Sequence, residues 1–143
     1  MTRAYEYAHV VGFEDTNLLG NVYYVNHLSW QGRCREMFLR DHAPELLEEI
    51  EGGLLIVTVK CACEYLEELR AFDEVIVRMS LTEHVQNRLT LSFEYWRRSS
   101  GTEQLVARGE QQLVVMRREG TRHVATAIPA ALRDALLPYS NAK

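Results

Sequence analysis

The segment from Thr16 to Arg35, TNLLGNVYYVNHLSWQGRCR, carries the side chains whose types and spacing are suited to chemistry. Its polar groups are amides, hydroxyls, one histidine and two guanidinium groups, with no carboxylate among them. The Asn17 amide cannot take a proton at neutral pH, but it can hold a water or a carbonyl group by hydrogen bonds. Arg35 can offer positive charge to a developing oxyanion. If the segment is an active site, it lacks the residue usually expected to activate water.

Hydrophobic periodicity predicts the elements that must position this segment. Residues 4–12 alternate as a strand, residues 13–22 form a loop of turn formers, and a long helix follows over about 23–41. Residues 46–51 predict a short acidic turn. Alternation then predicts four long strands with short connections, over 55–65, 75–81, 89–95 and 103–117, and Pro129 starts a short helix. The order predicts a single α+β domain over residues 1–143, with a long antiparallel sheet and one dominant helix.

Several details of these elements are also predicted. The long helix is apolar on most sides, which indicates a buried helix wrapped by the sheet. Gly32 in its middle indicates a close backbone approach, and Gly109 in the last strand indicates a possible bulge. Alternation from Leu55 through Val57 and Val59 to Tyr65 predicts one shared strand face.

Composition limits the class of partners. A net charge of -4 over 143 residues gives no global basic field, so no nucleic-acid partner is expected. No apolar run approaches membrane-spanning length, and the beginning of the sequence does not resemble a signal peptide, so no membrane partner is expected. Three cysteines make an odd count, which predicts a reducing cytoplasm. Cys61 and Cys63 are expected to be packing residues rather than metal ligands, and no cofactor is expected.

The loop N-x-x-G-N-V-Y-Y, the long helix and the sheet together resemble the hotdog fold, and more narrowly the acyl-thioesterases related to 4-hydroxybenzoyl-CoA thioesterase. Their pattern D-x-x-G-H-V-x-x-x-x-Y-x-x-W-x-E-x-x-R stands here as Asn17, Gly20, Asn21, Val22, His27, Trp30, Gly32 and Arg35. The family's loop aspartate falls on Asn17 and its helix glutamate on Gly32. Both usual carboxylate positions are therefore empty.

That combination, with GNVYYVN followed by WQGRCREMFLR, resembles the thioesterases of enediyne polyketide biosynthesis. The resemblance implies hydrolysis of a polyene β-ketoacyl thioester from the acyl carrier protein of an iterative polyketide synthase. The released acid would be prone to decarboxylation to a methyl ketone. The resemblance also implies a dimer with sites at its interface, and a homotetramer built as a dimer of dimers.

The chemistry that thioester hydrolysis would need suggests the site residues. Asn17 and Arg35 would replace the carboxylates, and the Tyr24 backbone amide, at the positive first turn of the helix, would be the oxyanion-hole donor. The expected substrate-binding residues are Gly20, Asn21, Tyr23 and His27. Structural alternatives stay open: Asn17 as a turn former, Arg35 in an ion pair, and His27 as a satisfied buried histidine.

Two other functions also stay open, a non-catalytic acyl-binding module and a general acyl-CoA thioesterase. Because acyl carrier proteins are acidic, a chain of net charge -4 needs a local basic patch to bind one. The candidate groups, which lie near predicted strand ends, are Arg88, Arg97 and Arg98, and Arg117, Arg118 and Arg122.

Overall fold

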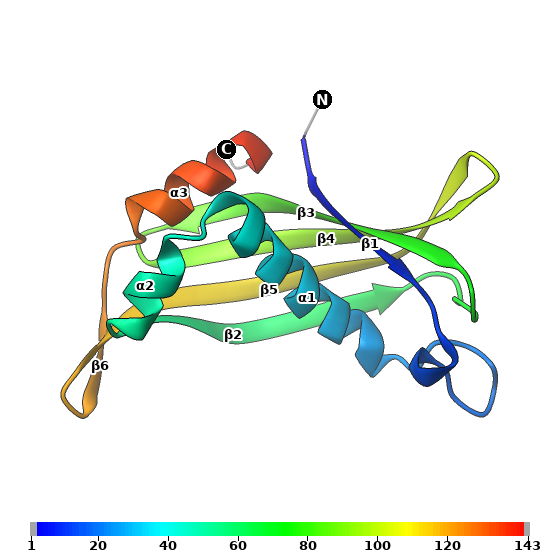
Figure 1. The fold of residues 1–143 in the computed structure, drawn as a ribbon, viewed down its shortest axis with the longest axis horizontal. Coiled ribbons are helices and arrows are strands. Elements are labelled where there is room, and N and C mark those ends of the chain that lie inside the picture. The colour runs from blue at the N-terminus through cyan, green and yellow to red at the C-terminus, as the bar shows by residue number, and fades with distance from the viewer. Residues whose placement is uncertain (1–2, 142–143) are drawn as a thin grey trace.

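An antiparallel sheet of six strands curls around one long helix in the computed structural model, which describes residues 3–141 (Figure 1). The strand order is β1-β3-β4-β5-β2, and β6 pairs with the end of β5. In chain order the elements are β1 (Tyr5–Val10), η1 (Phe13–Asp15), α1 (Val25–His42), α2 (Leu46–Glu51), β2 (Leu54–Tyr65), β3 (Glu74–Val85), β4 (Arg88–Ser99), β5 (Thr102–Glu119), β6 (Arg122–Ala125), α3 (Ala130–Leu136) and η2 (Leu137–Tyr139).

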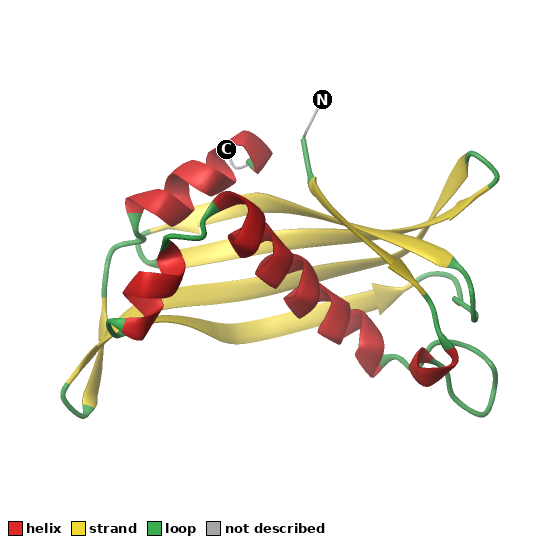
Figure 2. Cartoon of the chain, in the orientation of Figure 1, coloured by secondary structure: helices red, strands yellow, loops and turns green. Residues whose placement is uncertain are grey.

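The predicted α+β architecture is confirmed, with α1 lying across one face of the sheet and α2 and α3 near one end (Figure 2). The acidic segment 46–51 is a helix rather than a turn, and Pro129 is the N-cap of α3. The short strand β6 was not predicted. In the described part of the chain, no helix is long and apolar enough to cross a membrane.

Helix α1 buries one stripe rather than most of its surface. The buried residues recur every three or four positions and are His27, Trp30, Gln31, Cys34 and Phe38. Arg33, Glu36 and Arg40 on the other side are exposed. The expectation of a helix buried on most sides is therefore wrong for the single chain, because the sheet covers only one side of it (Figure 1).

The close approach between helix and sheet is at Gly109, not at Gly32. Nothing lies within 4 Å of a Cβ built at Gly32, so the expected approach there is wrong. A Cβ at Gly109 would fall on Nε2 of Gln31 and lie 3.1 Å from the carbonyl oxygen of Ala62. Gly109 pairs in regular register with Cys63 and Phe93, so the bulge expected there is also wrong. The register shift of β4 and β5 lies between Tyr95 and Trp96.

A register shift between Thr58 and Lys60 changes the phase of strand β2. Before the shift, Leu54 is buried and Thr58 accepts a hydrogen bond from Arg35 of α1. After the shift, Tyr65 contacts the His27 ring of α1. Val57 and Val59 are exposed. The expectation that both valines share a face with Tyr65 is therefore wrong, since one extra residue exchanges the two faces of a strand. Cys63 packs against the core as expected, whereas Cys61 is exposed.

A pair of glycine substitutions tests this packing. Gly109→Ala should lower the free energy of unfolding by about 1–3 kcal/mol, because the fully buried Gln31 has no room to move away. Gly32→Ala should raise it by about 0.5–1 kcal/mol, since alanine is a better helix former and meets open space. Chemical denaturation measures both. Adding Gln31→Ala to the Gly109 variant should recover part of the loss, and equal effects at the two glycines would contradict the packing.

Candidate active site

The Arg35 guanidinium lies between α1 and the sheet, with neutral partners only. Its Nη1 donates to Oγ1 of Thr58 and to Oε1 of Gln111, each at 3.0 Å. Glu36, the neighbouring carboxylate, instead pairs with Arg33 at 3.5 Å. Burial lowers the pKa of Arg35 and Glu36 opposes this shift, yet an arginine stays charged near neutrality. Among residues 3–141 no carboxylate lies within ion-pair distance of Arg35, so the structural ion pair considered for it is absent there.

Asn17 lies in an exposed turn. Its Oδ1 accepts from the backbone N–H of Leu19 at 2.9 Å, and its carbonyl accepts from the N–H of Gly20 at 2.9 Å. The φ of Gly20 is +87°, a conformation that suits glycine. This is the Asx turn considered from the sequence. Among residues 3–141 the side chain bonds only through its oxygen, which leaves the Nδ2 group available to a ligand.

The two tyrosine amides at the start of α1 differ. The N–H of Tyr23 donates to the carbonyl of Asp15 at 2.9 Å, so that amide is engaged. For the N–H of Tyr24, no acceptor appears among the residues that the structure describes. The hydroxyl of Tyr65 donates to the carbonyl of Tyr24 at 2.7 Å and fixes this end of the helix. The Tyr24 amide is therefore the free donor that an oxyanion hole needs.

His27 lines a cavity of about 360 Å³ beside Tyr24, together with Asn21 and Tyr65. The His27 side chain is 3% exposed and packs against the rings of Trp30, Tyr65 and Tyr95. Its Nδ1 is buried and finds no partner in the described part of the chain. Nδ1 is therefore buried without a partner of regular geometry among residues 3–141, while the Tyr24 backbone interacts with the ring and opposes the effect of burial on its pKa. Burial lowers the pKa of His27 to about 4, so the ring is neutral near neutral pH.

Gln31 completes a polar stripe along α1 that the sequence analysis missed. It lies one helical turn after His27 and one turn before Arg35, so all three face the sheet. Its Nε2 donates to the carbonyl of Ala62 at 3.0 Å, while its buried Oε1 finds no partner among residues 3–141. A glutamine in a helix usually indicates a solvated face, and only the spacing of four could have revealed the stripe.

Two carboxylates at the cavity, Glu67 and Glu68, were also missed. Glu68 accepts from Nδ2 of Asn21 at 3.2 Å and pairs with Arg70 at 3.2 Å. The Oδ1 of Asn21 is buried and has no partner in the described region. Asp15, by contrast, binds His9 and the N–H of Gly12, each at 2.9 Å, so its carboxylate holds the loop together.

The structure brings only some of the expected residues together. Asn21, Tyr24 and His27 share one cavity. Arg35 comes eleven positions after Tyr24, which is about 16 Å along a helix. Arg35 instead borders a small apolar space of about 20 Å³ next to α3. Within one chain, Arg35 and the Tyr24 amide are too far apart to act on the same carbonyl.

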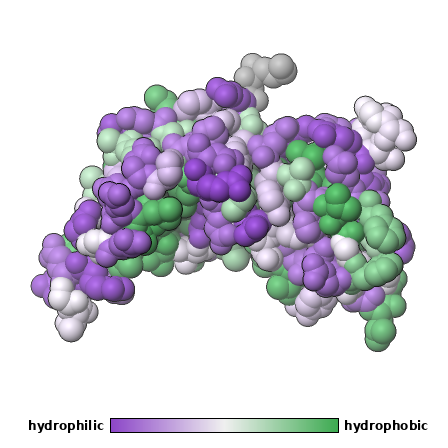
Figure 3. All heavy atoms as spheres, viewed as in Figure 1, coloured by the Kyte–Doolittle hydropathy of each residue, from purple (hydrophilic) through white to green (hydrophobic). Residues whose placement is uncertain are grey.

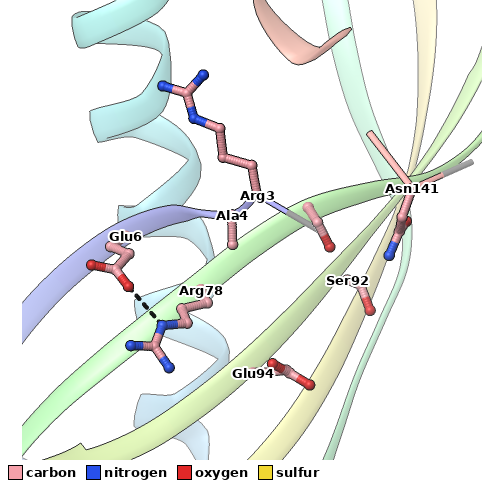
Figure 4. A pocket seen from close by; sticks show the side chains of 8 residues that line it. Arg3, Ala4, Glu6, Arg78, Ser92, Glu94 and Asn141 are labelled. Atoms are coloured by element: carbon pink, nitrogen blue, oxygen red, sulfur yellow. Dashed lines mark hydrogen bonds and ion pairs between the residues drawn. The ribbon is translucent and has the colours of Figure 1, made fainter. Parts of the chain in front are cut away.

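Other surface features lie apart from this cavity. A larger hollow of about 830 Å³ lies beside β1, β3 and β4 and contains the Glu6–Arg78 ion pair of 2.6 Å (Figure 4). Apolar side chains are exposed in the loop before α1 and near it (Figure 3). They include Phe13, Leu18 and Phe72.

Comparison with known proteins places this geometry in a family. The profile of the thioesterase-like superfamily matches residues 11–136. The solved dynemicin thioesterase, studied for induced-fit and allosteric effects of polyene binding, is 45% identical over 96% of this chain and 97% of its own, with a TM-score of 0.92. The chain belongs to the thioesterase-like superfamily. Thioester hydrolysis is the activity that this membership supports. A comparison with curated proteins finds no match.

More distant structures confirm the hotdog fold. The 4-hydroxybenzoyl CoA thioesterase from Pseudomonas sp. strain CBS-3 is 21% identical over 93% of this chain and 99% of its own, with a TM-score of 0.79. A 1,4-dihydroxy-2-naphthoyl-CoA thioesterase from Synechocystis is 18% identical over 93% of this chain and 95% of its own, with a TM-score of 0.81. At such identities the likeness concerns the fold alone.

The neutral state of His27 in this thioesterase gives a prediction about stability. Between pH 6.5, the ordinary pKa, and about 4, the folded value, only the unfolded chain binds a proton at this ring, so stability falls as pH falls. The difference corresponds to about 3 kcal/mol over that window. Denaturation of wild type and His27→Gln from pH 7 to 4 should show a shallower pH dependence for the variant. Parallel curves would contradict a neutral buried His27.

Proposed function

We propose that this protein hydrolyses a polyene β-ketoacyl thioester carried on the acyl carrier protein of an iterative enediyne polyketide synthase. The observation that carries the proposal is the Arg35 cation, held at the helix–sheet seam by Thr58 and Gln111 without a carboxylate partner within ion-pair distance in the described structure. The 45% identity to the dynemicin thioesterase supports the substrate class.

The reaction requires little proton chemistry from the protein, because a thioester is already an activated acyl group. Water adds to the thioester carbonyl, the carbon–sulfur bond breaks, and the pantetheine thiolate takes a proton while the acid is released. The Tyr24 amide and Arg35 stabilise the oxyanion, and the Asn17 amide holds the water or the carbonyl. The released β-keto acid then loses carbon dioxide and leaves a methyl ketone.

The separation of Arg35 from Tyr24 supports a site shared between two copies. Strand β2 lies at the sheet edge, with one side unpaired in the described chain. Antiparallel pairing of two β2 edges about a twofold axis would continue the sheet and set the two α1 helices antiparallel. Arg35 of one copy could then approach the Tyr24 amide of the other. Two such dimers would form the expected homotetramer.

Substitutions at the two proposed catalytic residues test the function. Asn17→Ala and Arg35→Ala should each lower single-turnover hydrolysis of a carrier-bound 3-oxoacyl chain by about 10²-fold or more. Mass spectrometry of the products should find the methyl ketone. Neither residue titrates between about pH 5 and 8, so the wild-type rate should show no acid limb of the carboxylate kind.

Glu67→Gln and Glu68→Gln are the matched controls, because these carboxylates line the cavity. A wild-type inflection near pH 4–6 that disappears in either variant would assign a general base there and overturn the account. Faster turnover of CoA esters than of carrier esters would favour a general acyl-CoA thioesterase. Acyl binding without hydrolysis would favour the non-catalytic module.

The assembly gives a further prediction. Light scattering should find a multiple of the 16.5 kDa chain, up to the tetramer. Lysines at Val57 and Val59, which are exposed on the edge strand, should shift the mass towards the monomer, because like charges would face one another across the twofold axis. Val85→Lys, an exposed position at the end of β3, should leave the mass unchanged. A wild-type monomer would contradict edge pairing.

A further inference from the structure

At one end of the sheet lie four arginines that have no carboxylate within ion-pair distance in the part of the chain that the structure describes. Arg88 begins β4 beside Val114 of β5, Arg117 and Arg118 lie near the end of β5, and Arg122 begins β6. Arg88, Arg118 and Arg122 are exposed. None of the four has an ion pair within the described residues, although Glu119 faces Arg122 in the β5–β6 register. We call these four residues the arginine end.

Within the described residues, eight other arginines have a carboxylate partner, whereas Arg3 lies over the Tyr139 ring and Arg35 has neutral partners. The arginines paired with carboxylates are Arg33, Arg40, Arg70, Arg78, Arg97, Arg98, Arg108 and Arg133. This pairing distinguishes the two arginine groups that the sequence analysis considered for binding a carrier protein. Arg97 pairs with Asp73 at 3.8 Å, and Arg98 pairs with Glu103 at 3.0 Å. Their charge is therefore already compensated, whereas that of the arginine end is not.

The surface at the arginine end is also hollowed. A depression of about 340 Å³ lies between the β3–β4 hairpin and the segment after β6, lined by Gln86, Asn87 and residues 125–127. The acidic helix α2 adjoins the same end through β2, but its carboxylates have no ion pair with the arginines in the described structure. The carboxylates of α2 therefore lie next to the arginine end without pairing with it, and Glu119 faces Arg122 without an ion pair in the described structure.

We propose that the arginine end is the docking surface for the acidic face of an acyl carrier protein; this rests on the function proposed above. In a chain of net charge -4, uncompensated arginines at one end of the sheet attract an acidic partner only over a short range and so select where it docks. The depression beside the arginines accommodates a protruding segment of the partner.

A carrier protein docked at the arginine end of one copy delivers its acyl chain to the site of the neighbouring copy. The N–H of Arg118 donates to Gly53 at the start of β2, whereas Tyr65 at its other end bonds to Tyr24. The 12 residues of β2 span about 40 Å, which exceeds the reach of a phosphopantetheine arm. In an antiparallel β2–β2 pair, the start of one strand lies beside the end of the other. The arginine end of one copy therefore lies near the Tyr24 cavity of its partner copy.

Charge reversal tests the docking surface. The double variant Arg118→Glu and Arg122→Glu should lower kcat/KM for a carrier-bound 3-oxoacyl chain about tenfold or more at low salt, and flatten its salt dependence. The same acyl chain on N-acetylcysteamine should be hydrolysed at the wild-type rate, since it has no carrier to dock. The matched control, Arg33→Glu and Arg133→Glu, makes the same change in net charge on α1 and α3 and should keep wild-type carrier turnover.

The outcomes separate this proposal from the function itself. If wild type hydrolyses the carrier thioester and both double variants behave alike, the docking surface is wrong and the function stands. If wild type hydrolyses neither the carrier thioester nor the N-acetylcysteamine thioester, the proposed function is wrong.

A mixed dimer tests which copy is served. One copy carries Arg118→Glu and Arg122→Glu, and the other carries Asn17→Ala. If the carrier docks on one copy and its acyl chain enters the site of the other, the mixed dimer keeps one intact combination: the arginine end of the Asn17→Ala copy and the Asn17 of the charge-reversed copy. Carrier turnover by the mixed dimer should therefore exceed that of a dimer in which both copies carry the same variant. Turnover no higher than the parents would overturn the arrangement between copies.

Discussion

The contact of Gln31 with the backbone at Gly109 governs how α1 sits on the sheet. The glutamine occupies the space that a side chain on β5 would fill, and it bonds to the carbonyl of Ala62 on β2. This fixes both the height and the rotation of the helix over two strands. With that rotation set, residues at intervals of four, His27 and Arg35, must also face the sheet. The orientation of these polar side chains towards the sheet therefore depends on the missing side chain at Gly109.

Polar groups buried between α1 and the sheet lower the stability of the fold. The buried Nδ1 of His27 and Oε1 of Gln31 have no partners within residues 3–141, and each such group costs about 1–3 kcal/mol. Arg35 has hydrogen bonds but no counter-ion within ion-pair distance in that range. Stability alone would favour apolar residues at these places. A bound acyl carbonyl would accept a hydrogen bond from His27 where its Nδ1 carries the proton, whereas the Gln31 oxygen needs a donor such as water.

The sequence predicted the elements better than their contacts. Long alternating runs identified β2 to β5, but β6 is only four residues long, which is too short for a periodicity to mark it. The run LLIVTV is apolar in both phases, which hid the register shift at Val59. An isolated glycine in a strand indicates either a bulge or a close approach, and at Gly109 the second reading is correct. The lack of a counter-ion for Arg35 depends on tertiary contacts, and no local pattern encodes those.

The same geometric constraint links the site and the arginine end. Arg35 is separated from the Tyr24 amide along α1, and the arginines are separated from the Tyr24 cavity along β2. Each separation runs along an element, so no side-chain rearrangement within a chain can close it. A single twofold operation at the β2 edge reverses both elements at once. It would therefore bring the charged groups of one copy to the cavity of the other, which is why one edge contact suffices for both proposals.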